Sequence, residues 1–205
     1  MRLAIVVPVL AGLGFASSED APLPGKYFPL AQGNRWVFRV VLPRRVKSEY
    51  RLIRTITRVT GDPQAGADAR AGAVYSMREE DYSIPKAEWP DEPFEYSIQE
   101  NGDIYCTKCG GFVLKAPLEA AQSWTSPNGY GPEISRLIAV HKAVEAGGKL
   151  YRDCVVVETV SGEEHTVTRY AAGVGPVLVE VFQGASKQAV RREELVSFSR
   201  VNVPH

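Results

Sequence analysis

The sequence predicts a mainly β protein: a single antiparallel sheet of about ten strands, strongly curled or barrel-like, with at most one or two short helices. Two observations lead to this fold class. Apolar and polar residues alternate with a period of two from Gly33 onward, and the β-rich runs are short and separated by segments rich in Gly, Pro, Asn and Asp. Many short strands with short connections are typical of antiparallel sheets that curl or close.

The first expected strand shows the alternation most clearly. In the segment RWVFRVVLP, Trp36, Phe38 and Val40 share one face, Arg39 lies on the other, and Pro43 ends the strand. Further β-rich runs are residues 50–60, 73–80, 94–100, 104–106, 112–115, 134–144, 150–160, 165–171, 177–183 and 194–201. The pattern therefore predicts a half-buried sheet with turn chemistry at each connection.

Two segments also favour a helix. Residues 116–124 place Pro117 in a possible first turn, and the tail SKQAVRREELVSF could begin as a helix before its β-like end. Within the run 134–144, the spacing of Ile138 and Val144 predicts one shared face and puts His141 on the opposite, more solvated face.

The N-terminus, MRLAIVVPVLAGLGFASSEDAP, has the pattern of a secretory signal peptide cut after Ala16. One positive residue, Arg2, precedes an uncharged run that is shorter than the roughly 20 residues of a membrane-spanning helix. We expect a protein that does not span a membrane and is secreted or periplasmic, against the alternative of a cytosolic protein with an apolar start. The expected organisation is a signal peptide (1–16), an N-terminal extended segment (17–32) and a single β-rich domain (33–205).

The charges are balanced overall but unevenly placed. The chain has 24 basic and 24 acidic residues, which does not favour binding to nucleic acid. Basic residues gather between Arg39 and Thr60, and acidic residues gather between Glu79 and Asp103. This grouping favours cross-strand charge pairs on two complementary solvated faces over a nucleic-acid or lipid-headgroup site.

The segment DIYCTKCGGFVLK contains two cysteines, Cys106 and Cys109, at an expected hairpin bend. In an oxidising compartment two such close thiols tend to form a disulfide. A zinc knuckle is the alternative, with Cys154 and His141 as candidate further ligands, and free thiols are a third. A thioredoxin-like redox site is disfavoured, because Gly110 and the β-like residues after it do not begin a helix. We expect no cofactor, with zinc as the alternative.

No catalytic arrangement emerges from the remaining residues. The serines lack the Gly-x-Ser-x-Gly pattern of hydrolases, and Cys154 has the context of a small buried residue. Trp124 and Tyr130 flank the loop TSPNGYGP and are candidates for an aromatic lip of a ligand site, although simple packing explains them as well. The sequence favours a protein without enzymatic activity, and a hydrolase ranks last among the alternatives.

Several segments resemble one family. KYFPLAQGNRWVF (Lys26–Phe38), VLKAPLEAAQSWT, YRDCVVVE (Tyr151–Glu158) and RYAAGVGPVLVEV (Arg169–Val181) resemble, in order, the landmarks of exported or lipoprotein-type bacterial β-rich proteins of unknown function. The chain departs from the family pattern at Ala172 and at the pair Ala120 and Ala121. The resemblance implies a β-rich fold and an extracytoplasmic compartment, and it implies no established catalytic activity.

The sequence therefore favours an exported, non-catalytic β-protein of the cell envelope or extracellular space that acts as a binding or interaction module. Its expected partner is an envelope protein or a small apolar ligand, bound on the concave face of the curled sheet. The alternative is a metal-binding or redox protein centred on the CTKC motif.

Overall fold

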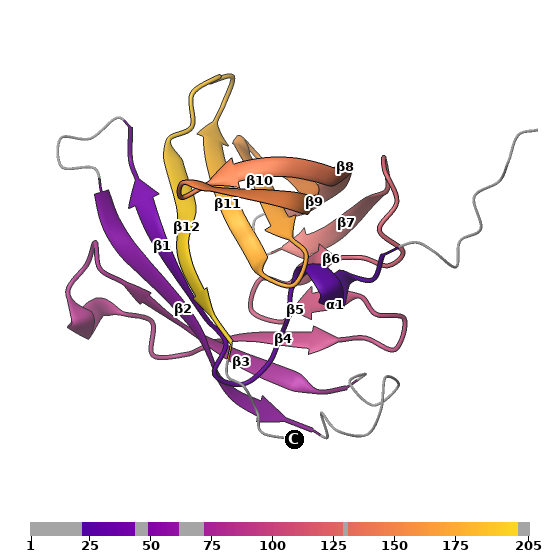
Figure 1. The fold of residues 1–205 in the computed structure, drawn as a ribbon, viewed down its shortest axis with the longest axis horizontal. Coiled ribbons are helices and arrows are strands. Elements are labelled where there is room, and N and C mark those ends of the chain that lie inside the picture. Colours follow the sequence, from indigo (N-terminus) through magenta and orange to yellow (C-terminus); the bar gives the residue numbers. More distant parts are fainter. Residues whose placement is uncertain (1–21, 44–48, 62–71, 129–130, 201–205) are drawn as a thin grey trace, which may run out of the picture.

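The computed structural model describes residues 22–43, 49–61, 72–128 and 131–200 of the 205-residue chain. The predicted signal peptide, residues 1–16, lies outside the described residues. Twelve strands form one antiparallel sheet. This sheet curls into a nearly closed barrel, as Figure 1 shows. The predicted fold class is therefore confirmed.

The elements follow one another along the chain. They are α1 (Pro24–Tyr27), β1 (Arg35–Val41), β2 (Glu49–Thr60), β3 (Val74–Asp81), the 3₁₀ turn η2 (Lys86–Glu88), β4 (Phe94–Ile98), β5 (Ile104–Cys106), β6 (Gly111–Leu114), β7 (Ser123–Asn128), β8 (Gly131–Ala146), β9 (Lys149–Ser161), β10 (Glu164–Ala171), β11 (Gly175–Gln183) and β12 (Arg191–Ser199).

The sheet is an up-and-down meander in the order β6-β5-β4-β3-β2-β1-β12-β11-β10-β9-β8-β7. Strands β1 and β12 come from opposite ends of the described chain and pair in the middle of the sheet. The two edge strands, β6 and β7, are consecutive in the chain. Curling of the sheet brings these edges together, so one seam remains in an otherwise continuous ladder.

Side chains close this seam where no backbone ladder forms. The Phe112 backbone N–H on β6 donates to Ser126 Oγ on β7 at 3.0 Å, and Trp124 Nε1–H donates to the Phe112 carbonyl oxygen at 2.9 Å. A Cβ atom on Gly111 would lie 2.6 Å from the Ser126 Cβ, so only glycine fits there without a shift. Side-chain hydrogen bonds thus tie the two edge strands together at Phe112, which protects this part of the sheet edge.

The interior of the barrel holds one hydrophobic core. The alternation predicted for the first strand is confirmed, because Trp36, Phe38 and Val40 on β1 are buried while Arg39 is exposed. Leu52 on β2 and Leu137 on β8 contribute to the same core from other parts of the barrel. Burial of apolar surface, at about 25 cal/mol per Å², is the main force that holds such a shell together.

The N-terminal segment packs into this core. It was expected to be extended, but residues 24–27 form a single helical turn. Tyr27 is 0% exposed and Phe28 is 4% exposed. The Gly173 backbone N–H donates to the Lys26 carbonyl oxygen at 2.6 Å, and the Tyr27 hydroxyl donates to Asp153 Oδ1 at 2.9 Å. This segment is therefore part of the folded unit.

The region expected to favour a helix at residues 116–124 is not helical. A cis peptide bond joins Ala116 to Pro117, turns follow, and β7 begins at Ser123. Polar turn residues around β7 obscure the apolar–polar alternation, so the sequence pattern did not predict this strand. The tail also differs from the expected helical start, because Arg191–Ser199 is strand β12, paired with both β1 and β11. Tertiary pairing overrides local helix preference at both places.

The prediction that Ile138 and Val144 share one face of β8 is wrong. Ile138 is 44% exposed, whereas Val144 is 7% exposed and belongs to the core. The register with β9 shifts between Leu137 and Ala139 and again before Lys142, and His141 has a φ of 53°. These bulges exchange the inward and outward faces halfway along the strand. No helix among the described residues is long and apolar enough to cross a membrane.

Candidate functional site

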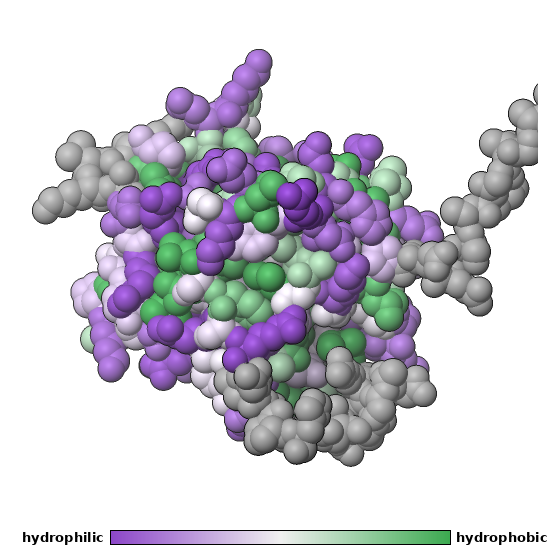
Figure 2. Space-filling model, in the orientation of Figure 1, coloured by the Kyte–Doolittle hydropathy of each residue, from purple (hydrophilic) through white to green (hydrophobic). Residues whose placement is uncertain are grey.

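A cavity of about 300 Å³, partly open to solvent, lies among inward-facing side chains of the barrel. Its walls come from strands on both sides of the β1–β12 pair. Aromatic rings form much of the lining, from Phe28, Trp36, Phe94, Tyr96 and Tyr170. The face seen in Figure 2 shows apolar residues gathered at the centre with hydrophilic side chains around them.

Three charged side chains also line this cavity: Arg54 on β2, Glu79 on β3 and Glu193 on β12. Arg54 Nε donates to Glu79 Oε2 at 2.7 Å, and Arg54 Nη1 donates to Glu193 Oε2 at 3.0 Å. The Glu193 side chain is 4% exposed, so its charge requires the pairing. Arg191 Nη2 also reaches Glu193 Oε1, at 2.8 Å, from a neighbouring hollow.

The guanidinium of Arg54 is held in its charged form. Burial acts to lower the pKa of Arg54, but the charges of Glu193 and Glu79 together outweigh it and raise that pKa above its usual value. Arg54 also lies over the Phe38 ring, with its Cζ 5.1 Å from the ring centroid. The network is thus a fixed set of charges at one wall of the cavity.

Phe28 organises the aromatic wall. Its ring meets Tyr96 edge to face at a centroid distance of 5.3 Å and lies tilted 5.9 Å from Trp36 and 6.1 Å from Tyr170. Burial raises the pKa of Tyr96 to about 12 and raises that of Tyr170 further. Both phenols are therefore neutral near pH 7 and act as hydrogen-bonding groups.

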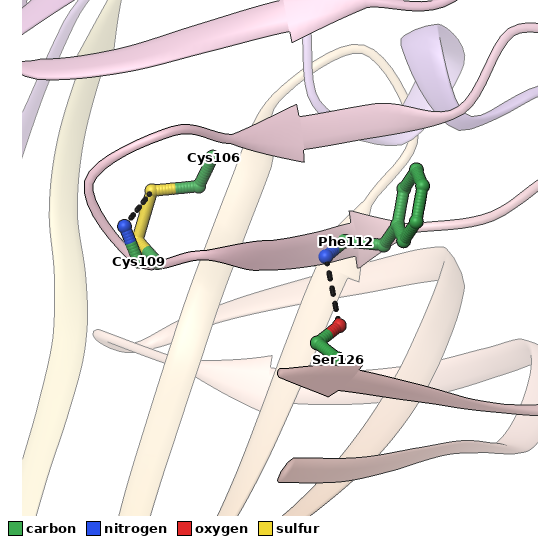
Figure 3. The surroundings of a disulfide bond; sticks show 4 residues. All are labelled: Cys106, Cys109, Phe112 and Ser126. Atoms are coloured by element: carbon green, nitrogen blue, oxygen red, sulfur yellow. Dashed lines mark hydrogen bonds between the residues drawn. A yellow bond between two sulfur atoms is a disulfide. The ribbon is translucent and has the colours of Figure 1, made fainter. Parts of the chain in front are cut away.

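Cys106 and Cys109 lie at the bend between β5 and β6 and are joined by a disulfide, as Figure 3 shows. The Cys109 backbone N–H donates to Cys106 Sγ at 3.1 Å, and the same view shows Ser126 beside Phe112 at the seam. Cys106 is buried and pairs in register with Tyr96 on β4. Cys109 lines the cavity, so the motif contributes to its rim.

The other candidate metal ligands are not brought together with this bend. Cys154 is a free, fully buried thiol in the core, and burial raises its pKa to about 11. His141 lies at the surface, with Nδ1 3.0 Å from Asp153 Oδ1. The described part of the chain contains no group of three or more His, Cys, Asp or Glu side chains placed to share a metal ion.

Trp124 and Tyr130 were the candidates for an aromatic lip of a ligand site, and the structure describes only Trp124. Trp124 is 7% exposed and uses its indole N–H to close the seam, so it serves packing and not a rim. Tyr130 lies outside the described residues.

Two wider hollows lie elsewhere on the molecule. One of about 800 Å³ lies between β1, β2 and the turn at Gly147 and Gly148, and another of about 460 Å³ adjoins Arg191. The larger hollow is lined in part by Arg39, which is 47% exposed and already pairs with Glu194. Volume alone does not make a ligand site. The smaller interior cavity is the stronger candidate, because aromatic rings and desolvated charges converge there.

No protein-family model matches this sequence, and no curated protein matches it. Two solved structures are similar in shape. One is a proposed lipoprotein from Parabacteroides distasonis, with 11% identity over 84% of this chain and 98% of its own, and a TM-score of 0.48. The other is a proposed exported protein with a YmcC-like fold from Bacteroides fragilis, with 10% identity over 85% of this chain and 99% of its own, and a TM-score of 0.49. At these values neither likeness assigns a family or an activity to this chain.

Sequence reasoning missed the charged wall of the cavity. A signal was present, because Arg54 lies between the buried Leu52 and Ile56 at the same parity of β2. A charged residue at an apolar parity indicates an inward-facing charge that needs a partner. Finding Glu79 and Glu193 would also have required the register of β3 and the pairing of β1 with β12, which the sequence pattern does not specify.

Proposed function

We propose that this chain is an exported, non-catalytic binding protein whose barrel interior accepts one small, largely apolar ligand. The observation that carries the proposal is the cavity of about 300 Å³, with aromatic walls and a few fixed polar groups. Small-molecule sites have this composition, and their volumes begin at about 300 Å³. In small β-barrels side chains fill the interior. A ligand fits only where these side chains leave space around the barrel axis.

Two observations support export. The N-terminus has the charged start, apolar run and small-residue cleavage pattern of a signal peptide. The Cys106–Cys109 disulfide suits a secreted or periplasmic protein, because such bonds persist in oxidising compartments.

A binding role agrees with the chemistry of the charged wall. Glu79 and Glu193 are both held by Arg54 in ion pairs, which fixes their orientation. Such an arrangement recognises and orients a ligand, whereas general acid-base catalysis requires a group poised to transfer a proton.

The test is a titration of the mature protein with N-phenyl-1-naphthylamine, a neutral apolar fluorophore. We expect saturable binding of one probe per chain with increased, blue-shifted emission. Val179→Phe should weaken this binding at least about tenfold, because Val179 lines the cavity and a larger side chain fills it. Val160→Phe is the matched control, because Val160 is 41% exposed on β9 and does not line the cavity.

Saturable binding that Val179→Phe abolishes and Val160→Phe preserves would support the interior site. Absence of saturable binding, or equal binding by both variants, would overturn it. Thermal unfolding of each variant shows whether the fold is retained.

A further inference from the structure

The interior cavity contains polar groups that no described residue satisfies. Glu79 uses Oε2 to accept from Arg54, and within the described part of the chain its Oε1 has no hydrogen-bond partner. The Tyr96 hydroxyl likewise has none among these residues. Both side chains line the cavity, and Glu79 is 19% exposed there. The cavity therefore offers a free carboxylate oxygen beside aromatic rings.

The charges that line the cavity are one guanidinium and two carboxylates, from Arg54, Glu79 and Glu193. Arg191 offsets Glu193 from outside, because it bonds the other oxygen of that carboxylate from the neighbouring hollow. Glu79 is left with Arg54 alone as its partner, and Arg54 is shared with Glu193. The two guanidiniums and two carboxylates balance in charge, and Glu79 Oε1 is the carboxylate oxygen that neither guanidinium engages.

This arrangement disfavours two classes of ligand. An anion would meet two carboxylates and would have to displace one of them from Arg54, which costs the buried pair. A wholly apolar ligand would cover the Glu79 oxygen and the Tyr96 hydroxyl without replacing their hydrogen bonds to water, which carries a desolvation penalty.

A protonated amine meets both requirements. Its N–H groups donate to a carboxylate in a charge-assisted hydrogen bond, and its positive charge is attracted to the faces of aromatic rings. An attached apolar body would contact the remaining walls, which include Met77 and Val113. We propose that the ligand of this cavity is a small organic ammonium cation with an apolar body, held by Glu79 and the aromatic wall. This inference rests on the proposed interior binding site.

The test compares three probes of nearly equal size and different charge: 2-phenylethylammonium, 2-phenylethanol and 3-phenylpropanoate. Each is titrated calorimetrically into the unaltered mature protein at pH 7. We expect the cation to bind at least about tenfold more tightly than the alcohol, and the anion to bind most weakly. This comparison needs no variant, so it stands whatever a substitution does to folding.

Two variants locate the charge that is responsible. Glu79→Gln keeps an acceptor oxygen for Arg54 and removes the negative charge, so it should weaken the cation about tenfold and change the alcohol by less than about twofold. Glu95→Gln is the matched control, since Glu95 follows Phe94 on β4 and does not line the cavity. It should leave the binding of all three probes unchanged.

The outcomes separate this inference from the proposal on which it rests. If the neutral fluorophore binds inside the barrel and the alcohol binds as tightly as the cation, the cation inference is overturned and the interior site stands. An unchanged cation affinity in Glu79→Gln would also overturn it. If neither the fluorophore nor any of the three probes binds, both proposals fall.

Discussion

Arg54 on β2 and Glu79 on β3 face each other inside the barrel, with Arg54 Nε donating to Glu79 Oε2 at 2.7 Å. The two residues come from the basic and acidic segments of the sequence, and they pair across neighbouring strands as the charge grouping predicted. The expected solvated setting is wrong for this pair, because it lies at the cavity wall with Glu193. Its energetics therefore follow the rules for partly buried charges.

Replacing Arg54 should destabilise the protein strongly. Arg54→Met leaves Glu79 and Glu193 without their shared counter-charge, and removal of one partner of a buried ion pair costs about 2–4 kcal/mol here. Urea unfolding monitored by tryptophan fluorescence measures the loss in the free energy of unfolding.

The control for this variant is Arg39→Met. Arg39 pairs with Glu194 at the solvated surface, so its loss should destabilise the protein much less than the loss of Arg54. Equal losses of unfolding free energy in the two variants would show that removing Arg54 from the interior network costs no more than removing a surface charge.

The barrel was predictable because alternation, turn residues and short runs all point to one fold class. The inward set on β1 follows directly from the parity of Trp36 and Phe38. The faces of β8 were not predictable, since a bulge near His141 exchanges them, and bulge positions depend on pairing with β9. The cavity could not be predicted from the sequence either, because its walls come from strands far apart in the chain.

Asp153 should make the stability depend on pH. Burial acts to raise the pKa of Asp153, but hydrogen bonds from Lys26, Tyr27 and His141 outweigh it and lower that pKa below its ordinary value of 3.8. A lowered folded-state pKa stabilises the protein above the unfolded-state value, and this contribution is lost as the pH falls below about 4. Solvent screening of this surface group limits the effect to about 0.5–1 kcal/mol.

Asp153→Asn should therefore be less stable than the unaltered protein at pH 7, and the difference should shrink toward pH 3. Urea unfolding at several pH values measures this convergence. Glu163→Gln is the control, because Glu163 is an exposed residue of the turn between β9 and β10. A difference that stays constant with pH would contradict the assignment to Asp153.

The Cys106–Cys109 disulfide should contribute modestly to stability and more clearly to binding. The bond closes a loop with a sequence separation of 3, and such a short loop stabilises by about 2 kcal/mol or less. Cys109 lines the cavity, so a reducing agent should weaken binding of the naphthylamine probe about twofold or more. The Cys106→Ser/Cys109→Ser variant should bind as weakly and be insensitive to the reducing agent. If reduction leaves the binding of the probe unchanged, the bend at Cys106 and Cys109 does not contribute to the ligand site.

Cys154 should resist alkylation in the folded protein. It is fully buried, and burial raises its pKa to about 11, so the reactive thiolate is rare at pH 8. We expect no iodoacetamide adduct in the native protein and one adduct per chain in guanidinium chloride, both read from the intact mass without reduction. Rapid labelling of the native protein would show that the core opens at β9.

Closure of the seam should depend on the fit between Gly111 and Ser126. In Gly111→Ala the new Cβ would lie 2.6 Å from the Ser126 Cβ and 2.7 Å from its Oγ, so a shift of the edge strands should cost about 2 kcal/mol. Ser126→Gly alone removes the acceptor for the Phe112 N–H, at about 1–2 kcal/mol. The double variant relieves the clash, so its free energy of unfolding should exceed the additive expectation by about 1 kcal/mol or more. Urea unfolding of the four proteins measures this coupling energy, and simple additivity would show that the two edges do not pack against each other in solution.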